Sequence, residues 1–489
     1  MYYFVRMILE IVCMTIWVPD LSKSCQPTYL AIADAIGDAV RHGQLRPGDA
    51  LPTHRLLADL VGVNVSTITR AYHEAARRRL VGGEVGRGTF VLGVASETAL
   101  FALEHRPEGG VIDLSLNVPP RAARDHDLAA ALKRMDPTQA AGYLHYPSPD
   151  EVLVHRQAAV GWLKRRGVEA DPEGLVVCAG AQHAMVTALH FFAEEEEVVC
   201  ESLVYPGLRA SARHWQRRLH PVPMDAEGIL PDAFEMACRG GLRFAVVSPT
   251  LHNPTTATMG LQRRRRIVEI ARKWNVMLVE EDVYGMLQEN APPPLYTMAP
   301  ERVLYLTGLS KTVAPGLRIG YLVLPPGLRG RMHDDEHHTT WYVSSLTMAI
   351  ATRWLNDGTA WRRLVKQRAE LAARHRMCQE QLKDFNWRGE PHCPHVWLVA
   401  PPGGSETFAK RALAAGVVVV PSSVLAAGRL FAADGVRISL GAPPDRKTLA
   451  EGLSRLASLA GGCPGSPSSH AWAADPCKMS GPAPKKNTL

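Results

Sequence analysis

Residues 303–320 read VLYLTGLSKTVAPGLRIG. The first four form an apolar run that is typical of a strand buried on both faces of a parallel sheet. A short polar turn then leads to Lys311, whose amine is therefore expected just beyond the end of a strand. Ligands of open α/β sheets bind beyond the carboxyl ends of the strands. This stretch predicts an α/β fold with its chemistry at one edge of the sheet.

Other short apolar runs recur on both sides of this stretch, with helical spacing between them. Such an alternation favours an α/β domain with a mainly parallel sheet. The runs span residues 175–178, 198–200, 244–247, 276–279, 303–306, 319–324, 395–399, 417–420 and 436–440.

The composition excludes several classes of protein. The chain has 489 residues, of which 46% are hydrophobic and 21% charged, so it is globular rather than disordered. Its nine cysteines include no Cys-x-x-Cys pair, which argues against a secreted disulfide framework and favours the reducing cytoplasm. The net charge of +7 is too small to indicate a nucleic-acid partner by itself.

Neither a membrane segment nor a metal site is expected. The apolar run at residues 7–18 contains Glu10 and is shorter than the ~20 residues that a membrane helix needs. A signal peptide is disfavoured because no small-residue cleavage site follows, which leaves a surface-lying lead-in or a start placed too far upstream. The histidines of residues 333–338 have no matching ligands elsewhere. The run Arg263–Arg266 is expected on the solvated face of a helix.

Changes of pattern divide the chain into four parts. Residues 27–93 are predicted to form a small helical domain that ends in a hairpin. Residues 94–112, which include a Pro-Glu-Gly-Gly stretch, are the expected linker. Residues 113–460 form the large α/β domain, and residues 461–489, rich in Pro, Gly, Ser and Lys, are expected to be a disordered tail.

Four segments of the large domain carry polar residues next to predicted strands. They are residues 247–255 (VSPTLHNPT), 278–285 (LVEEDVYG), 306–320 (LTGLSKTVAPGLRIG) and 436–441 (VRISLG). Each segment alone is a weak signal, but the four in this order resemble the fold-type I pyridoxal-phosphate enzymes, in their class I and II aminotransferase branch. The resemblance implies that the large domain binds pyridoxal 5′-phosphate.

The same resemblance implies a role for each matched residue. It makes Lys311 the catalytic amine that holds the cofactor as an internal aldimine, and Asp282 the carboxylate that keeps the pyridine nitrogen protonated. Arg437 matches the arginine that grips an α-carboxylate. The remaining contacts that it implies are Tyr284 and Asn253 to the phenolic oxygen, Arg318, Ser310, Gly180, Ala181 and Gln182 to the phosphate, Tyr205 on the ring face, and Tyr146 to the phosphate of a neighbouring subunit.

Two positions depart from the family's pattern. Gly308 stands where the family usually has a serine or threonine, so one phosphate hydroxyl is missing and Thr307 is its less well placed substitute. Ser202-Leu203 stands where Asp-Pro is usual. Both departures lower the expected cofactor affinity and leave the core set in place.

The small domain resembles the winged helix-turn-helix of the GntR group. The resemblance rests on GQLRPGDALPTHRLLA at residues 43–58, GV at 62–63, RAY at 70–72 and GRGTF at 86–90. Thr53 is expected to cap the second helix, and the recognition helix is expected over residues 64–78. Val65 stands where the group often has an arginine. The implied DNA contacts are Arg55, Ser66, Thr67 and Arg70, with Arg87 and Gly88 on the wing.

Both halves in this order resemble the MocR/GabR-type transcription regulators. The resemblance implies a homodimer that binds double-stranded DNA at an operator with two half-sites. It also implies sensing of an amine, an amino acid or a B6 vitamer by aldimine exchange at Lys311. One alternative is a pyridoxal-phosphate-dependent aminotransferase with an appended winged helix, and another is a regulator without a cofactor. The sequence leaves open whether the domain turns over substrate.

Overall fold

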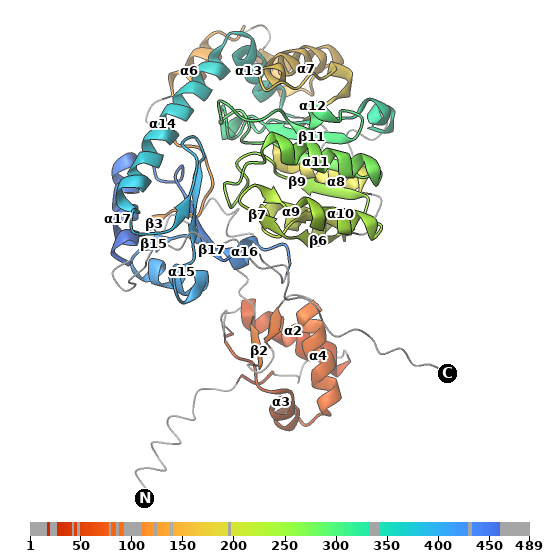
Figure 1. Cartoon of the computed structure of the whole chain (residues 1–489), viewed down its shortest axis with the longest axis vertical. Helices are drawn as coiled ribbons and strands as arrows, with labels where there is room; N and C mark the ends of the chain where they lie inside the picture. Colours follow the sequence, from red (N-terminus) through yellow and green to blue (C-terminus); the bar gives the residue numbers. More distant parts are fainter. Residues whose placement is uncertain are drawn as a thin grey trace, which may run out of the picture. The chain divides into compact units, whose positions relative to one another are not determined.

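The structure is a computed structural model of the chain. It divides into two units, Met1–His105 and Arg106–Leu489, here called the N-terminal and C-terminal units (Figure 1). The described residues are 17–19, 27–41, 44–45, 49–77, 80–84, 88–91, 110–121, 125–136, 138, 140–193, 197–332, 343–428 and 433–459. The expected tail and all of the expected linker before Gly110 lie outside them.

The described residues of the N-terminal unit form three helices followed by a hairpin. The Thr53 side chain accepts a hydrogen bond from the Leu56 amide at 3.3 Å, as the sequence predicts for an N-cap, and Gly62 ends the same helix with φ 73°, a conformation that glycine favours. The elements are α2 (Thr28–Arg41), α3 (His54–Val61), α4 (Val65–Arg77), β1 (Val81–Glu84) and β2 (Gly88–Val91).

A short third strand segment completes the hairpin of this unit. β1 and β2 are antiparallel, and residues 49–51 pair with β2 through Leu51 N to Thr89 O and Val91 N to Asp49 O, both at 2.8 Å. The Tyr72 hydroxyl on α4 donates to the Pro52 carbonyl at 2.8 Å. The predicted helix-turn-helix with a wing is confirmed.

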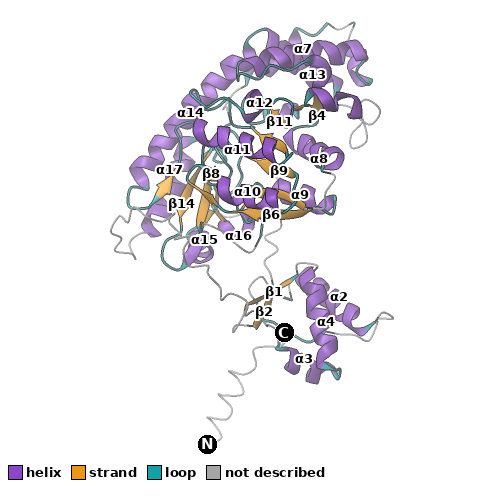
Figure 2. Cartoon of the chain, turned by 45° about the vertical axis from the view of Figure 1, so that its right-hand side comes forward, coloured by secondary structure: helices purple, strands orange, loops and turns teal. Residues whose placement is uncertain are grey.

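A seven-stranded sheet forms the centre of the C-terminal unit (Figure 2). Its order is β4-β12-β11-β10-β9-β5-β6, and every neighbouring pair is parallel except that β12 runs antiparallel to β4 and β11. Every residue of β9, β11 and β12 is buried, as predicted for strands covered on both faces. The strands are β4 (Leu175–Cys178), β5 (Glu197–Glu201), β6 (Arg218–Val222), β9 (Phe244–Val247), β10 (Met277–Glu281), β11 (Val303–Gly308) and β12 (Gly320–Val323).

Helices pack against this sheet and enlarge its core. α8 contacts β4, β11 and β12, while α7 packs against α13. The elements of this lobe are α6 (His126–Lys133), η1 (Ala140–Leu144), α7 (Pro149–Lys164), η2 (Pro172–Gly174), α8 (Ala181–Phe192), α9 (Pro206–His214), β7 (Met224–Asp225), β8 (Gly228–Ile229), α10 (Pro231–Arg239), α11 (Leu261–Lys273), α12 (Leu295–Met298), η3 (Pro315–Leu317), η4 (Pro326–Met332) and α13 (Ser345–Asn356).

A second, smaller lobe has its own sheet and core. Its sheet order is β13-β14-β17-β16, and the short strand β3 pairs in parallel with β15 beside it. The 23-residue helix α14 contributes Leu371 to the larger core and Cys378 to the smaller one, and so joins the lobes. The elements are β3 (Ile112–Asp113), α14 (Thr359–Gln381), β13 (Trp387–Arg388), β14 (His395–Val399), α15 (Gly404–Ala414), β15 (Val417–Val418), β16 (Val420–Pro421), α16 (Ser422–Leu425), β17 (Gly435–Ser439) and α17 (Arg446–Ala457).

The structure corrects three expectations. The apolar run at residues 417–420 divides into two strands that pair with different neighbours. Strand β6 was missed because its sequence, RLHPV, is polar and contains a proline, which suits its place at the sheet edge. Arg264 is fully buried rather than solvated, and it donates to the main-chain oxygens of Met259 and Pro249. It shares a helix face with the buried Ile267 and Val268.

Candidate functional site

The parallel strands β10 and β11 bring a lysine and a carboxylate pair to the same sheet edge. Lys311 follows β11, and Glu281 and Asp282 lie at the end of β10. The Lys311 Nζ donates a hydrogen bond to the main-chain oxygen of Asn117. Burial, with the neighbouring Arg437 charge second, lowers the pKa of Lys311 to about 8. A neutral amine is therefore accessible near physiological pH, which nucleophilic chemistry requires.

Asp282 is held in place by an arginine and a tyrosine. Its Oδ2 accepts from Arg166 Nε at 2.8 Å and from the Tyr305 hydroxyl at 2.9 Å. Both Asp282 oxygens also lie where a side chain at Gly285 would be, so glycine is required there. These contacts leave Asp282 Oδ1 buried and without a hydrogen-bond partner among the described residues, and the predicted role of Asp282 at a ring nitrogen stays a prediction.

Glu281 is the carboxylate that faces the lysine. Adjacent strand residues point to opposite faces, and Glu281 acts electrostatically on Lys311, Tyr284 and Tyr205. Its Oε2 accepts from the Ser248 hydroxyl at 2.9 Å. Burial raises the pKa of Glu281, while the Ser248 hydrogen bond and the Lys311 charge oppose that rise.

Ser248 also joins Glu281 to a second buried carboxylate. The Ser248 amide donates to Glu201 Oε1 at 2.9 Å. Burial raises the pKa of Glu201 to about 7, and the nearby Glu281 charge adds to that rise. Glu201 and Glu281 are therefore both hydrogen-bonded to Ser248, which directly follows β9.

Tyr284 lies in a small polar cluster beside Lys311. Its hydroxyl accepts from Asn117 Nδ2 at 2.9 Å, and the same nitrogen lies 3.1 Å from His395 Nδ1. Burial raises the pKa of Tyr284 well above its usual value and lowers the pKa of His395 well below its usual value. The histidine is therefore neutral at pH 7, so its Nδ1 accepts from Asn117 while its Nε2 donates to the His252 carbonyl at 3.3 Å.

Arg437 and Asn253, predicted to face a ligand, form a pair in this structure. Arg437 Nη1 donates to Asn253 Oδ1 at 2.9 Å, and Nη2 donates to the Ser115 carbonyl at 2.6 Å. The Arg437 side chain is buried and its Nε has no hydrogen-bond partner among the described residues. A planar anion is the natural partner for a guanidinium in such surroundings.

The N-terminus of α8 is surrounded by small residues and one arginine, here called the anion cradle: Gly180, Ala181, Ser310, Gly320 and Arg318. Gly180 has φ 92° and caps the helix without a side-chain hydrogen bond. A Cβ at Gly180 would lie 2.7 Å from Arg318 Nη2, and one at Gly320 would meet the Gly180 main chain. Arg318 Nη1 also lies 3.5 Å from the Ser310 hydroxyl. Free helix N–H groups beside an arginine suit an anion such as phosphate.

The missing phosphate hydroxyl at Gly308 has a steric explanation. A Cβ at Gly308 would lie 3.0 Å from the Ile319 carbonyl and 3.6 Å from the Ala181 Cβ. The Thr307 hydroxyl does not replace it, because it donates to the Asp282 carbonyl at 2.9 Å.

The remaining predicted cofactor residues are placed as follows. Ala181 opens α8 beside the cradle. Gln182 turns its Nε2 toward α9, where it donates to the Gly207 carbonyl at 3.1 Å and to the Ser211 hydroxyl at 2.8 Å. Tyr205 lies beside it and is within electrostatic reach of Arg437 and Arg318. Tyr146 is 69% exposed, as a residue that serves a neighbouring subunit would be in a single chain.

The predicted DNA contacts lie on α3, α4 and the hairpin. Arg55 and Ser66 are exposed, and Thr67 is half-buried. Arg70 is exposed, with its guanidinium 4.2 Å above the Tyr29 ring of α2. Gly88 opens β2, and Arg87 lies outside the described residues.

Sequence reasoning missed four residues that hold the site together. They are Arg166, Tyr305, Asn117 and His395. A strand-phase argument could have found Tyr305, since it pairs with Glu280 and so shares a face with Asp282. Asn117 and His395 carry no recognisable motif.

The described residues offer neither a metal site nor a helix that could cross a membrane. Within the ranges that the structure describes, no group of three or more His, Cys, Asp or Glu side chains could hold a metal ion. None of the helices in those ranges has the length and apolar character to cross a membrane.

Comparison with known proteins decides the family. Residues 109–456 match the family "Aminotransferase class I and II", and residues 28–91 match "Bacterial regulatory proteins, gntR family". The chain belongs to the MocR-type transcription regulators. A MocR-type regulator thus combines a GntR-type DNA-binding unit with an aminotransferase-like unit, as the sequence predicted.

Individual relatives and structures agree with this assignment. The HTH-type transcriptional regulator YdeF of Bacillus subtilis is 27% identical over 91% of this chain and 96% of its own length. The HTH-type pyridoxine biosynthesis transcriptional regulator PdxR of Corynebacterium glutamicum is 26% identical over 73% of this chain and 79% of its own. Kynurenine aminotransferase of Pyrococcus horikoshii, with a TM-score of 0.66 and 24% identity over 72% of this chain and 91% of its own, shares the fold of the C-terminal unit.

Proposed function

We propose that this MocR-type regulator holds pyridoxal 5′-phosphate at Lys311 and uses that site to sense a small amine or amino acid. The carrying observation is the half-buried Lys311, whose amine has a pKa lowered to about 8, beside an anion cradle and a buried arginine. The cofactor supplies an aldehyde that reacts with amines and a ring that draws electrons from the attached carbon.

The residues around Lys311 fit this cofactor in both charge and shape. Gly180, Ala181, Ser310 and Arg318 would take the phosphate, because they combine free helix N–H groups with a guanidinium. The ring nitrogen would meet Asp282, whose Oδ1 is buried and has no hydrogen-bond partner among the described residues, while Arg166 holds its Oδ2. The other expected contacts are Tyr284 and Asn253 at the phenolic oxygen, Tyr205 at the ring face, Gln182 behind Tyr205, and Tyr146 from a second subunit.

Arg437 narrows the class of effector. Its guanidinium is buried and now binds only neutral oxygens, those of Asn253 and Ser115. A carboxylate would give it the charged, bidentate partner that it lacks among the described residues. An effector that carries both an amine and a carboxylate therefore fits best: the amine would take the place of Lys311 and the carboxylate would pair with Arg437. This amine exchange is the sensing step of the proposal.

The N-terminal unit would bind DNA. The exposed residues of α3 and α4, with the wing, would meet the major groove and the phosphates of a half-site. In the proposed homodimer two such units would read an operator with two half-sites. None of the five cysteines of the described residues forms a disulfide and all five are buried, which agrees with action in the cytoplasm.

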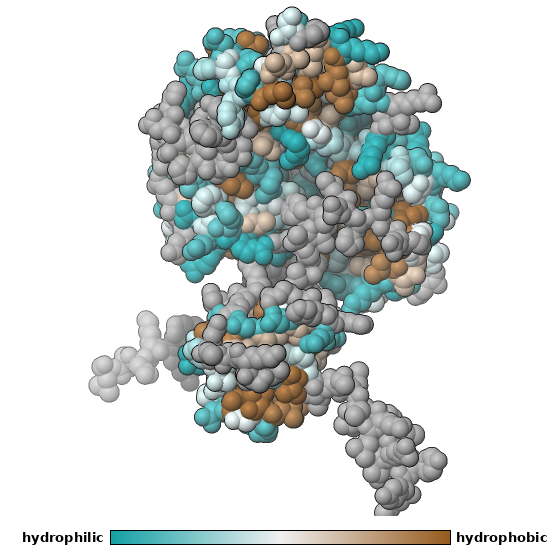
Figure 3. Space-filling view, turned by 180° about the vertical axis from the view of Figure 1, so that it is seen from behind, coloured by the Kyte–Doolittle hydropathy of each residue, from teal (hydrophilic) through white to brown (hydrophobic). Residues whose placement is uncertain are grey.

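An exposed apolar surface on the C-terminal unit supports the dimer. Figure 3 shows apolar residues gathered at the end of this unit where α7 and α13 lie. The exposed large apolar residues of α6, η1, α7 and α13 are Leu128, Leu132, Leu144, Leu153, Val154 and Leu346, and the exposed Tyr146 follows η1 in the chain. A monomer seldom leaves such a patch in water.

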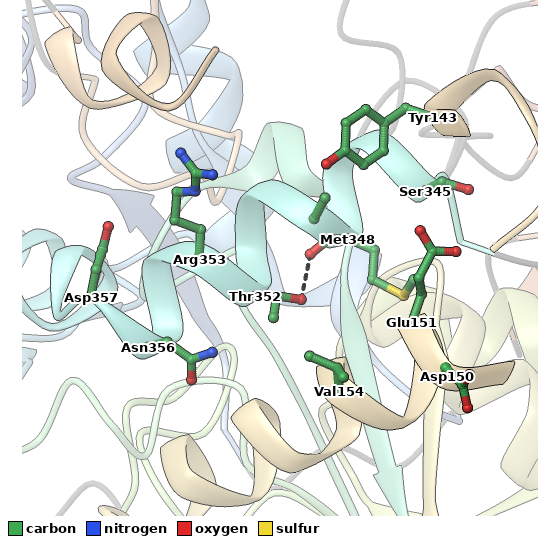
Figure 4. A pocket seen from close by; sticks show the side chains of 11 residues that line it. Tyr143, Asp150, Glu151, Val154, Ser345, Met348, Thr352, Arg353, Asn356 and Asp357 are labelled. Carbon is green, nitrogen blue, oxygen red and sulfur yellow. Dashed lines mark hydrogen bonds between the residues drawn. The ribbon is translucent and has the colours of Figure 1, made fainter. Parts of the chain in front are cut away.

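A groove beside this surface is open to a partner. It has a volume of about 580 Å³ and runs between η1, α7 and α13, with Tyr143, Val154 and Met348 among its lining residues (Figure 4). Charged side chains of Asp150, Glu151 and Arg353 stand along it. A second copy of the chain is the occupant that we propose.

The test is reconstitution of the full chain with pyridoxal 5′-phosphate. We expect a visible absorption band that borohydride reduction fixes to Lys311, and loss of that band in Lys311→Ala. The loaded protein should shift a DNA fragment from its own upstream region, and a candidate amino acid should change both the band and the DNA affinity. A chain that stays colourless, or DNA binding that no amine alters, would overturn the proposal. Repeated turnover from an amino donor to a 2-oxo acid would instead establish the aminotransferase alternative.

A further inference from the structure

The segment that follows the N-terminal unit enters the C-terminal unit through its smaller lobe. The N-terminal unit ends at His105. β3 then pairs with β15, where the Ile112 amide donates to the Gly416 carbonyl at 2.8 Å and the Leu114 amide to the Val418 carbonyl at 2.9 Å. Ile112 and Leu114 are buried in the core of that lobe. This anchor fixes one end of a short stretch that leads into the lysine site.

The next three residues give their carbonyl oxygens to side chains of the site. Ser115 O accepts from Arg437 Nη2 at 2.6 Å, and Leu116 O accepts from the Ser439 hydroxyl at 2.6 Å. Asn117 O accepts from Lys311 Nζ. The stretch is therefore held by the same arginine and lysine that the proposed function assigns to ligand binding.

The Asn117 side chain contacts two further residues of the site. Its Nδ2 donates to the Tyr284 hydroxyl at 2.9 Å and lies 3.1 Å from His395 Nδ1, which is neutral and accepts. Its Oδ1 is buried and has no hydrogen-bond partner among the described residues. An unpaired buried acceptor beside a reactive amine is a place where a bound molecule can supply the missing donor.

From these contacts we infer that Asn117 is a positioning residue that transmits occupancy of the lysine site to the segment leading from the N-terminal unit. The inference rests on the proposed function. In the free protein, Lys311 and Tyr284 hold Asn117 through its carbonyl and its amide. A carbonyl compound that engages the Lys311 nitrogen takes that donor away from Asn117 O. Residues 112–118 then lose one of the hydrogen bonds that hold their main chain in place.

The competing reading is that Asn117 only fills space. The structure argues against it, because the side chain makes two directed hydrogen bonds and leaves a third group unsatisfied. A space-filling residue in a site would be apolar, since an unpaired buried amide oxygen is costly. The two readings differ in what a ligand does to the backbone of residues 112–118.

The test is hydrogen exchange of the full chain, with and without pyridoxal 5′-phosphate, read on peptides that cover residues 110–121. In the wild type, we expect the cofactor to speed exchange there by about fivefold, the effect of one hydrogen bond on a local opening equilibrium. Asn117→Ala keeps the main-chain oxygen but loses the side-chain hydrogen bonds to Tyr284 and His395, so its segment should exchange fast already without the cofactor and speed up less when the cofactor binds. Lys311→Ala should show the same fast exchange with no covalent attachment.

Arg121→Ala is the matched control, because Arg121 lies on the same segment and is exposed. It should respond to the cofactor as the wild type does. Asn117→Asp is a second variant, which keeps the size of the side chain and removes both donated hydrogen bonds, and it should behave as Asn117→Ala does. Circular dichroism checks that each variant is folded.

Two outcomes would overturn the inference while leaving the proposed function intact: a wild type that takes up the cofactor, seen by absorbance, without altered exchange at residues 110–121, or an Asn117→Ala protein that keeps the full response. A wild type that takes up no cofactor at all would instead overturn the proposed function, and the inference with it.

Discussion

Arg166 and Asp282 form an ion pair inside the C-terminal unit, with Nε and Oδ2 2.8 Å apart and side chains that are 6% and 0% exposed. Breaking such a buried pair from one side leaves an uncompensated charge and costs about 3–5 kcal/mol. Arg166→Met should therefore lower the free energy of unfolding by about that amount, measured by urea denaturation. Lys164→Met is the control, since Lys164 is exposed at the end of α7, two residues before Arg166. Equal stability of Arg166→Met and the wild type would contradict this account of Asp282.

The second oxygen of Asp282 should affect the cofactor. Asp282→Asn removes the charge beside the buried Oδ1 that lacks a partner among the described residues, and a hydrogen bond to a charged group is worth about 1.5–3 kcal/mol. We expect its affinity for pyridoxal 5′-phosphate to fall by roughly tenfold to a hundredfold. Glu281→Gln, which removes the charge that acts on Lys311, is the control and should lose less affinity. A larger loss in Glu281→Gln than in Asp282→Asn would contradict the role that the sequence predicts for Asp282.

These two residues show what the sequence could and could not determine. Lys311 was located correctly beyond β11, because an apolar run followed by a short turn is a local signal. The contacts that Glu281 and Asp282 make depend on the strand face that each one occupies. The face that each residue occupies is set by distant partners such as Arg166, which lies 116 positions from Asp282 in the chain.

Asn117 illustrates the same limit for the rest of the site. Its contacts with Lys311 and Tyr284 join residues that are 194 and 167 positions apart. Such contacts arise only when two lobes with separate cores come together, and a single residue type at such a distance leaves no pattern in the sequence. The fold class and the winged helix were accessible because they rest on repeated, local spacing.

The lysine itself should show a pH dependence. Its pKa is lowered to about 8 by burial first and by the Arg437 charge second, so the reactive neutral amine gains population as pH rises through that value. The rate of cofactor attachment, followed by absorbance, should therefore increase with a midpoint near pH 8. Arg437→Met removes a positive charge and should move the midpoint upward. A midpoint near the ordinary lysine value of 10.5 in the wild type would contradict the burial of this amine.

DNA binding should depend on Arg55 through charge. Arg55 is exposed on α3, and the slope of log affinity against log salt falls by about 0.9 for each DNA phosphate that the protein no longer neutralises. Arg55→Ala should weaken binding to the upstream fragment and reduce the slope by about that amount. It is a cleaner test than a change at Arg70, whose guanidinium also stacks on Tyr29 within the domain. Lys447→Ala, exposed on α17 in the other unit, should leave the slope unchanged.

The dimer surface can be tested with two matched leucines. Leu144 is 87% exposed in the apolar surface beside Tyr146, and Leu413 is 57% exposed on α15 outside that surface. Leu144→Asp would place a charge in the proposed interface, where it would lose its hydration without gaining a partner. Sedimentation should show monomers for Leu144→Asp and dimers for Leu413→Asp and the wild type.

The same variant also connects the dimer to the cofactor site. If Tyr146 reaches the phosphate bound by a neighbouring subunit, the monomeric Leu144→Asp protein should bind pyridoxal 5′-phosphate more weakly, although Lys311 and its surroundings are intact. The loss should match that of Tyr146→Phe in a protein that remains dimeric. Full cofactor affinity in a monomeric Leu144→Asp protein would show that each subunit completes its own site. A wild-type chain that sediments as a monomer would exclude both the shared site and the paired reading of two half-sites.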